Sequence, residues 1–242
     1  MRYIVSLAIV LAACAAPALA AGGGGCSGVE ESAPTQAIRS ARVMGADKRV
    51  NFMASAGDSG ATKSCPSANA ACRRNTFVVS GDLVLVGGAE GDWACATFVS
   101  PRGVATSGWL PVAQLEMSTS GPMPTAADFA GKWLRTEATL ELKAKGADVE
   151  VKGDATWGAH DPERVKRGGV NIGEISGTVR PRGNMLAIGA DYNGAKAPSE
   201  LERSVDCIAR ARLFGRYLVV EDNRMCGGNN VSFTGVYLRQ SK

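Results

Sequence analysis

The sequence predicts an all-β protein of two domains, and three observations support this. Its 30 glycines and many short valine-rich runs indicate closely spaced turns and strands, and no long amphipathic helix is visible. Six of the seven cysteines lie beyond an apolar N-terminal segment, and an even number in an exported chain indicates disulfide bonds. Four of these six lie in the first half of the chain and two near its end, so we expect each domain to have its own bridges.

The first 20 residues have the form of a secretory signal peptide. Arg2 supplies the positive charge, residues 3–13 form an apolar stretch too short to span a bilayer, and residues 18–20 (ALA) have the small-x-small form of a cleavage site. Residues 11–14 (LAAC) offer an alternative, because they resemble a bacterial lipobox in which Cys14 is lipidated. Both alternatives predict a periplasmic or secreted protein, and only the lipobox alternative links it to a membrane, through a lipid anchor at Cys14.

Two further segments are expected to lack regular structure. Residues 21–36 contain four consecutive glycines and are predicted to be a flexible lead-in. Residues 117–127 combine serine, threonine and two prolines, a composition typical of a linker. These segments divide the chain into a first domain at 37–116 and a second at 128–242, each large enough for one modest core.

In the first domain, valine-rich runs between Gly-Asp and Gly-Gly pairs predict strands. The expected strands are Ala37–Val43, Arg49–Ala54, Thr76–Val86, Trp93–Val99 and Gly108–Leu115.

Three of these runs resemble a bacterial SH3-like (SH3b) domain. They are residues 81–86 (GDLVLV), 91–98 (GDWACATF) and 108–115 (GWLPVAQL), and residues 50–52 (VNF) match the opening of that family. Residues 53–55 (MAS) replace the arginine and the Ser-Gly-Pro that normally follow. The resemblance implies a small, half-open β-barrel that binds peptides, such as peptidoglycan stems or protein tails, and performs no chemistry.

Trp93 and Trp109 are the aromatic residues expected nearest the groove of such a barrel. A tryptophan offers a ligand a large apolar face and an N–H donor. The alternative is that both side chains fill the core.

The cysteine spacing predicts staples rather than a metal site. Cys65 and Cys72 are seven residues apart, a spacing unlike the paired CxxC motifs of zinc sites, and the chain has a single histidine. We therefore expect no structural metal. Four cysteines in one domain allow three pairings. We expect the pairs Cys65–Cys72, Cys26–Cys95 and Cys207–Cys226.

Alternating runs in the second domain predict an antiparallel β-barrel or sandwich of about eight strands. The expected strands are Phe129–Arg135, Thr139–Ala144, Val149–Trp157, Val170–Arg180, Met185–Ala190, Val205–Leu213, Arg216–Glu221 and Val231–Arg239. Between Val205 and Leu213 the odd-numbered residues are apolar, while Asp206, Arg210 and Arg212 take the other face. We therefore expect a sheet with one face in water.

Three resemblances concern the second domain. Its opening, with a glycine two residues before Trp133, resembles lipocalin-type and avidin-type barrels, in which this tryptophan stacks under an arginine of the last strand, here Arg239. Residues 153–157 (GDATW), 173–177 (GEISG) and the C-terminal run are similar to a family of small exported proteobacterial β-proteins of unknown activity. Size and disulfides are also similar to periplasmic lysozyme inhibitors of flattened-barrel type, although their Ser-Gly-x-x-Tyr motif has no match.

The most polar stretch is the connection at residues 157–169. It carries four candidate binding residues, His160, Arg164, Lys166 and Arg167. Long loops on rigid barrels often bind partners, so this loop is predicted to grip an acidic surface or a carboxylate. The alternative is a solvated loop whose charges keep a strand edge from pairing with other chains.

These observations predict a binding protein rather than an enzyme. The single histidine and the absence of a nucleophile elbow leave little for catalysis, and no cofactor is expected. A net charge of +4 without a dense basic stripe argues against nucleic acid. We expect an exported, non-catalytic cell-envelope protein that recognises a peptide, a wall fragment or a protein. The alternatives are an inhibitor or immunity protein against a lysozyme-like or other envelope-targeting hydrolase, and a carrier of a small apolar ligand inside the barrel.

Overall fold

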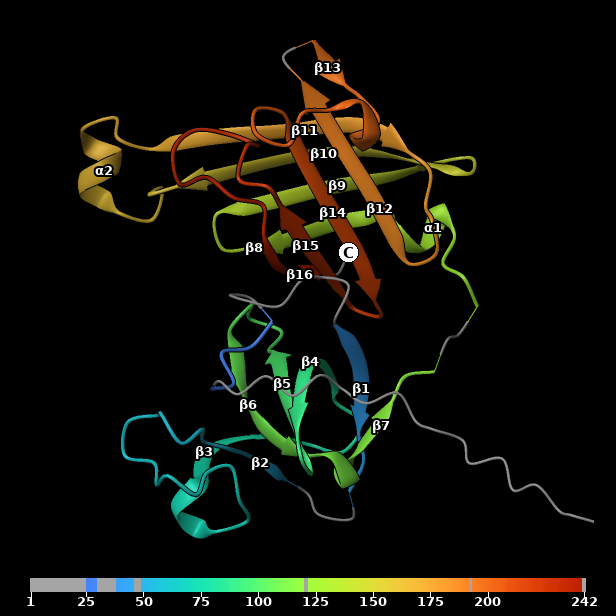
Figure 1. Cartoon of the computed structure of the whole chain (residues 1–242). Coiled ribbons are helices and arrows are strands. Elements are labelled where there is room, and N and C mark those ends of the chain that lie inside the picture. Colours follow the sequence, from blue (N-terminus) through green and yellow to red (C-terminus); the bar gives the residue numbers. More distant parts are fainter. Residues whose placement is uncertain (1–24, 30–37, 46–48, 120–121, 192, 241–242) are drawn as a thin grey trace, which may run out of the picture.

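The computed structural model is all-β, which confirms the predicted fold class (Figure 1). It describes residues 25–29, 38–45, 49–119, 122–191 and 193–240. The expected signal peptide at 1–20, Cys14 and most of the expected lead-in at 21–36 lie outside these ranges. Among the described helices, none is long and apolar enough to cross a membrane.

The first sheet contains seven of the described strands in the order β3-β2-β6-β5-β4-β1-β7. All of its pairings are antiparallel. The strands are β1 (Arg39–Val43), β2 (Val50–Met53), β3 (Arg73–Val78), β4 (Leu83–Glu90), β5 (Trp93–Val99), β6 (Ala105–Pro111) and β7 (Leu115–Met117), with short 3-10 helices η2 (Ala70–Cys72) and η3 (Val112–Gln114).

The run expected as one strand at Thr76–Val86 is instead β3, a turn and β4. The turn forms because the carboxylate of Asp82 accepts the backbone N–H of Val79 at 2.9 Å. Gly81 within it has φ +92°, a conformation that glycine adopts without steric cost. The valine run therefore belongs to two strands that follow each other in the chain, are separated by three strands in the sheet, and contribute to one core.

The second sheet contains nine of the described strands in the order β11-β10-β9-β8-β16-β15-β14-β12-β13. It curls until β11 lies beside β12, so that the sheet forms a nearly closed barrel. Its elements are α1 (Ala126–Phe129), β8 (Gly131–Arg135), β9 (Ala138–Lys145), β10 (Asp148–Trp157), α2 (Pro162–Lys166), β11 (Asn171–Val179), β12 (Met185–Asp191), β13 (Gly194–Ala195), the 3-10 helix η4 (Pro198–Glu200), β14 (Cys207–Phe214), β15 (Tyr217–Asp222) and β16 (Gly235–Arg239).

Large apolar side chains occupy the barrel interior. The fully buried ones include Phe129, Trp133, Leu140, Leu186, Ile188, Leu218, Phe233 and Tyr237. At Gly153 a Cβ would lie only 2.5 Å from a methyl carbon of Leu140, so the packing leaves no room for a side chain there. The space that a carried apolar ligand would need is filled at these positions.

The base of the barrel is closed by Trp133. The guanidinium of Arg239 lies 4.6 Å from the centre of its ring, the contact that the opening motif predicts. The indole N–H donates to the carbonyl of Phe129 at 2.9 Å. Gly131 has φ +146° and lies against the side chain of Arg239, so the glycine of the motif makes room for the arginine.

The last predicted strand, Val231–Arg239, is shorter than expected and begins at Gly235. The preceding residues are held by the carboxylate of Asp222 instead of by a ladder. It accepts hydrogen bonds from the hydroxyls of Ser232 and Thr234 at 2.7 and 2.6 Å and from the N–H of Phe233 at 3.1 Å. These side-chain bonds replace the strand pairing.

Burial of Tyr237 predicts a loss of stability at high pH. Burial raises the pKa of its hydroxyl from 10.0 to about 12, and that hydroxyl donates to the carbonyl of Phe233 at 2.8 Å. The unfolded chain releases this proton near pH 10 and the folded chain does not, so stability is full below pH 10 and falls between about pH 10 and 12. The expected loss is about 2–3 kcal/mol. Thermal unfolding across this range should show a smaller decline for Tyr237→Phe than for the wild type, and equal declines would contradict the assignment.

The outer face of β15, together with Phe214 at the end of β14, packs against the first sheet rather than facing water. In β14, Cys207, Ala209 and Ala211 point into the barrel as predicted, but Val205 lies before the strand and is 65% exposed. The residues expected on the wet face, Asp206, Arg210 and Arg212, are half-buried. The apolar cluster between the two sheets contains Val29, Ile38, Leu85, Val99, Phe214, Tyr217, Val219 and Val236. The expected wet face of β14 is therefore only partly exposed, and the neighbouring face of β15 is covered by the first sheet.

Tyr217 is the polar centre of this interface. Its hydroxyl lies 3.0 Å from the carbonyl oxygen of Leu83 and 3.3 Å from that of Val99, and donates to one of them. The same hydroxyl accepts hydrogen bonds from the N–H of Val99 at 3.3 Å and from Arg216 at 2.7 Å. The second sheet thus supplies partners for backbone groups of the first.

The described part of the expected lead-in, residues 25–29, is fixed to the first sheet. Cys26 and Val29 are buried, and the N–H of Val29 donates to the hydroxyl of Thr97 at 3.0 Å. Gly28 has φ +84° and passes so close to Ser107 that a Cβ would overlap its hydroxyl. The prediction of flexibility is wrong for these residues, because a disulfide and two close contacts hold them.

Within the described residues the structure contains three disulfides, the same pairs that the sequence favours. Cys26–Cys95 joins the N-terminal segment to β5, Cys65–Cys72 closes the loop between β2 and β3, and Cys207–Cys226 links β14 to the loop after β15. Each bridge lies within one sheet and its loops.

Candidate binding hairpin

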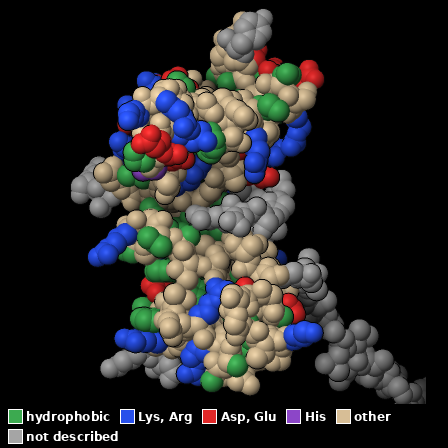
Figure 2. All heavy atoms as spheres, turned by 90° about the vertical axis from the view of Figure 1, so that its left-hand side faces the viewer, with side chains coloured by type: hydrophobic (Ala, Val, Ile, Leu, Met, Phe, Trp, Pro, Cys, Tyr) green, Lys and Arg blue, Asp and Glu red, His purple; other side chains and the backbone are tan. Residues whose placement is uncertain are grey.

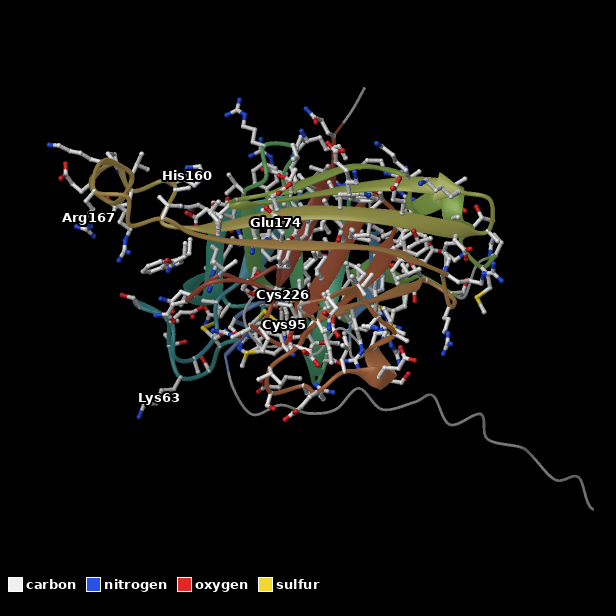
Figure 3. The ribbon with its side chains drawn as sticks, turned by 90° about the horizontal axis from the view of Figure 1, so that it is seen from above. Lys63, Cys95, His160, Arg167, Glu174 and Cys226 are labelled. Carbon is white, nitrogen blue, oxygen red and sulfur yellow. A yellow bond between two sulfur atoms is a disulfide. The ribbon has the colours of Figure 1, made fainter. Side chains whose placement is uncertain are left out.

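Strands β10 and β11 form a long hairpin that extends beyond the barrel and ends in α2 (Figure 1). The two strands pair from Val149 with Val179 to Trp157 with Asn171. Seen from above, His160 and Arg167 lie at the far end of this hairpin, well away from the disulfide cysteines Cys95 and Cys226 (Figure 3). The connection at 158–170 is therefore the projecting end of a rigid element.

The short helix α2 begins at a well-formed cap. The carboxylate of Asp161 accepts the N–H groups of Glu163 and Arg164 at 3.0 and 3.3 Å, and Pro162 takes the first helical position. A side-chain oxygen at this position and a proline directly after it both favour helix initiation. The polar stretch is thus a folded turn of helix.

Arg164 fixes α2 to the end of β10. Its guanidinium lies 3.8 Å from the centre of the Trp157 ring, and its Nε lies 3.5 Å from the carboxylate of Asp161. At Gly158, which has φ +87°, a Cβ would lie 2.5 Å from the Cδ of Arg164. Of the four basic candidates in the loop, Arg164 therefore holds the loop together.

A second contact joins the loop to the turn between β8 and β9. The side chain of Glu137 accepts the N–H of Ala159 at 2.7 Å, and its backbone carbonyl accepts the N–H of Thr156 at 2.8 Å. Glu137 has φ +60°, an uncommon conformation for a residue other than glycine. The loop is thus held by two contacts in the absence of a partner, one from Arg164 to Trp157 and one from Glu137 to Ala159.

The remaining candidates face outward. His160, Lys166 and Arg167 are exposed, and Val165 beside them is 54% exposed. Ile172, at the start of β11, is 65% exposed. Viewed end-on, the tip of the second domain shows Lys and Arg side chains around a small acidic area, with His160 at its edge (Figure 2). The hairpin end combines two exposed cations with exposed apolar side chains.

The structure places the two tryptophan candidates elsewhere, in the first sheet. Trp109 is only 3% exposed and its indole N–H donates to the hydroxyl of Ser55 at 2.9 Å, so it fills the core and offers no face to a ligand. Trp93 is half-buried and packs against the disulfide cluster that contains Cys95. The core alternative therefore describes Trp109, and neither tryptophan meets the basic loop.

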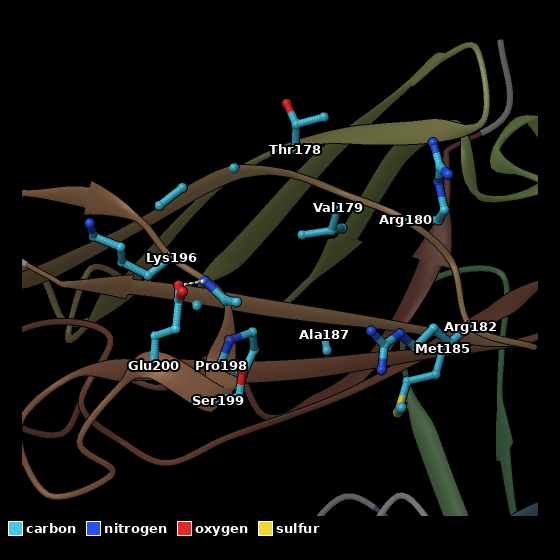
Figure 4. Close-up of a pocket in the computed structure, with 14 residues that line it drawn as sticks. Thr178, Val179, Arg180, Arg182, Met185, Ala187, Lys196, Pro198, Ser199 and Glu200 are labelled. Atoms are coloured by element: carbon cyan, nitrogen blue, oxygen red, sulfur yellow. Dashed lines mark hydrogen bonds between the residues drawn. The ribbon is translucent and has the colours of Figure 1, made fainter.

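One surface feature has no counterpart in the sequence analysis. A groove of about 520 Å³ lies on the barrel between β11 and β12, beside β13 and η4 (Figure 4). It is lined largely by small side chains, and Arg180, Arg182 and Lys196 line it as well. Its residues come from four separate elements, so no motif in the chain marks it.

Among the described residues, no group of three His, Cys, Asp or Glu side chains could hold a metal ion. Comparison with protein-family models, with curated proteins and with solved structures found no match to this chain.

Proposed function

We propose that this protein is an exported, non-catalytic binding protein of the cell envelope that recognises a peptide, wall fragment or protein partner. The end of the β10–β11 hairpin is its contact surface. The observation that carries this proposal is the loop held in place by the Trp157–Arg164 stack, the Asp161 cap and the Glu137 contact, with Lys166 and Arg167 left exposed. A loop that is already ordered loses little conformational entropy on binding.

The chemistry of the hairpin end favours an acidic partner. Lys166 and Arg167 lie beside the exposed apolar side chain of Val165, so a partner meets positive charge next to apolar surface. Charges of this kind steer encounter and select the partner, while the apolar contact contributes affinity.

The first sheet serves as a support in this proposal. The SH3-like resemblance implies peptide binding there, but the burial of Trp109 removes one of the two aromatic faces on which such a groove would rely. Three disulfides suit the oxidising compartment to which the signal sequence directs the chain.

Charge reversal at the hairpin end should abolish partner capture. The double variant Lys166→Glu, Arg167→Glu is expected to weaken binding by about tenfold or more, because it removes two attractions and adds two repulsions. Immobilised mature protein is incubated with envelope extract, and captured partner is quantified at several salt concentrations. Lys143→Glu, on the exposed face of β9, is the matched control and should capture the wild-type amount. Equal capture by the double variant would contradict the assignment of the surface.

A second function, inhibition of a lysozyme-like or other envelope hydrolase, is favoured by the shape of the hairpin. A narrow, ordered projection suits insertion into the acidic cleft of such an enzyme, and the cationic end provides the complementary charge. Inhibition of hydrolase turnover by the pure protein distinguishes this function from simple attachment.

A further inference from the structure

The groove between β11 and β12 is the place where the barrel remains open. On one side it is bordered by Thr178 and Val179 of β11, and on the other by Met185, Ala187 and Gly189 of β12. Figure 4 shows Val179 and Ala187 facing each other across it. From Met185 to Gly189 the groove is about 13 Å long, which is the length of four residues of extended chain.

Three β12 residues, Met185, Ala187 and Gly189, direct backbone groups toward this groove, and within the described residues only those of Ala187 face no other strand or turn. Met185 exchanges backbone hydrogen bonds with Arg182 at 2.9 and 3.2 Å, and the carbonyl of Gly189 accepts the N–H of Lys196 at 2.9 Å, both on the side away from β14. Antiparallel strands direct alternate residues to the same side, so the N–H and C=O of Ala187 also point there. In the described residues β13 pairs only with Ala190 and Asp191, so no strand covers Ala187.

The β11 edge has the same property. The carbonyl of Ile172 accepts the N–H of Gly228 at 2.9 Å on the side away from β10. Thr178 lies six residues further along the strand, so its N–H and C=O point to that side too. Two strand edges therefore border one opening.

Small side chains and cations shape the opening. Ala187 presents only a methyl group to the groove, whereas Gly189 is covered by Lys196 and Leu201, and Gly177 lies against Ala195. Figure 4 shows basic side chains at both ends of the groove. Arg180 is paired with Asp148 at 2.7 Å.

Two of the groove's cations are available for a ligand. Arg182 and Lys196 are exposed and form no ion pair within the described part of the chain. The acidic side chain in the lining, Glu200, is occupied in part as a cap that accepts the N–H of Ala197 at 3.2 Å.

We propose that this groove binds an extended acidic peptide segment as an added strand. The peptide pairs its backbone with Ala187 or Thr178, and its carboxylates meet Arg182 and Lys196 at the two ends. Backbone pairing supplies affinity, and the end charges select acidic sequences. This site is separate from the hairpin end and does not depend on the function proposed there.

The test uses fluorescence anisotropy of the mature protein with a labelled peptide, acetyl-Glu-Val-Glu-Val-Glu, at low ionic strength. We expect binding of this peptide and none of its Lys-Val-Lys-Val-Lys counterpart at the same concentration. N-methylation of the two valines should weaken binding by about tenfold, because it removes backbone donors. Arg182→Glu and Lys196→Glu should each weaken it about fivefold, while Lys143→Glu should change it less than about twofold.

Three results would overturn the proposal. Undetectable binding of the acidic peptide would show that the groove is not a peptide-binding site. Equal affinity for the N-methylated peptide would show that the peptide binds by ionic attraction alone and does not pair as an added strand. Unchanged affinity in the two charge-reversal variants, together with aggregation, would mean that these cations only protect a strand edge from other chains.

Discussion

Trp133→Ala is expected to lower the free energy of unfolding by about 4 kcal/mol, the largest effect of any substitution considered for the barrel. The side chain is fully buried at the barrel base, and its indole N–H is bonded to the carbonyl of Phe129. Truncation leaves a cavity among large neighbours and an unpaired carbonyl, and both are costly. Chemical denaturation of the disulfide-intact protein measures the change.

Arg239→Ala provides the matched control. Its guanidinium stacks on Trp133 and donates to the carbonyl of Asp128 at the exposed side of the ring, so its loss should cost only about 1 kcal/mol. In a double-mutant cycle the two effects should be less than additive, because each residue loses its partner when the other is changed. Full additivity would show that the stack contributes nothing.

Tyr217→Ala is expected to separate the unfolding of the two sheets. The variant removes a fully buried ring from the apolar cluster between them, together with the hydroxyl that bonds the carbonyl of Leu83 and the N–H of Val99. We expect a loss of about 3–4 kcal/mol and two transitions in calorimetry where the wild type shows one, because the second sheet no longer stabilises the first.

Tyr217→Phe keeps the ring and removes only the hydroxyl, so it should cost about 1–3 kcal/mol and retain a single transition. A single unshifted transition for Tyr217→Ala would mean that the interface does not couple the two sheets.

Much of the fold is predictable from local pattern. Strand β5 begins and ends where the sequence predicts, at Trp93 and Val99, because alternating small and apolar residues are bounded by turn glycines. The three disulfides and the contact of Arg239 with Trp133 are also those expected. The disulfide pairs follow from the positions of the cysteines, whereas the contact of Arg239 with Trp133 is what the resemblance to lipocalin-type and avidin-type barrels implies.

The remaining features depend on contacts between distant parts of the chain. Nothing around Tyr217 indicates that it points out of the barrel to meet Leu83 and Val99, since a buried outward residue looks the same in sequence as a buried inward one. Val29 docks onto the first sheet through its hydrogen bond to Thr97 and the close approach of Gly28 to Ser107, and the glycine-rich composition of this segment does not reveal these contacts. The candidate residues of the hairpin end are predictable in part. The polarity of the loop identifies it in the sequence, but it does not show that Arg164 contacts Trp157 and Asp161 within the protein.

The most direct test of the hairpin as contact surface is site-specific photo-crosslinking in envelope extract. A benzophenone amino acid replaces Val165, which is 54% exposed between the cap of α2 and its two exposed cations, and a second probe replaces Phe77 in the first sheet. The proposal predicts one dominant adduct from position 165, lost in the Lys166→Glu, Arg167→Glu background, and no matching adduct from position 77. An adduct formed only at position 77, or one at position 165 that survives charge reversal, would contradict it.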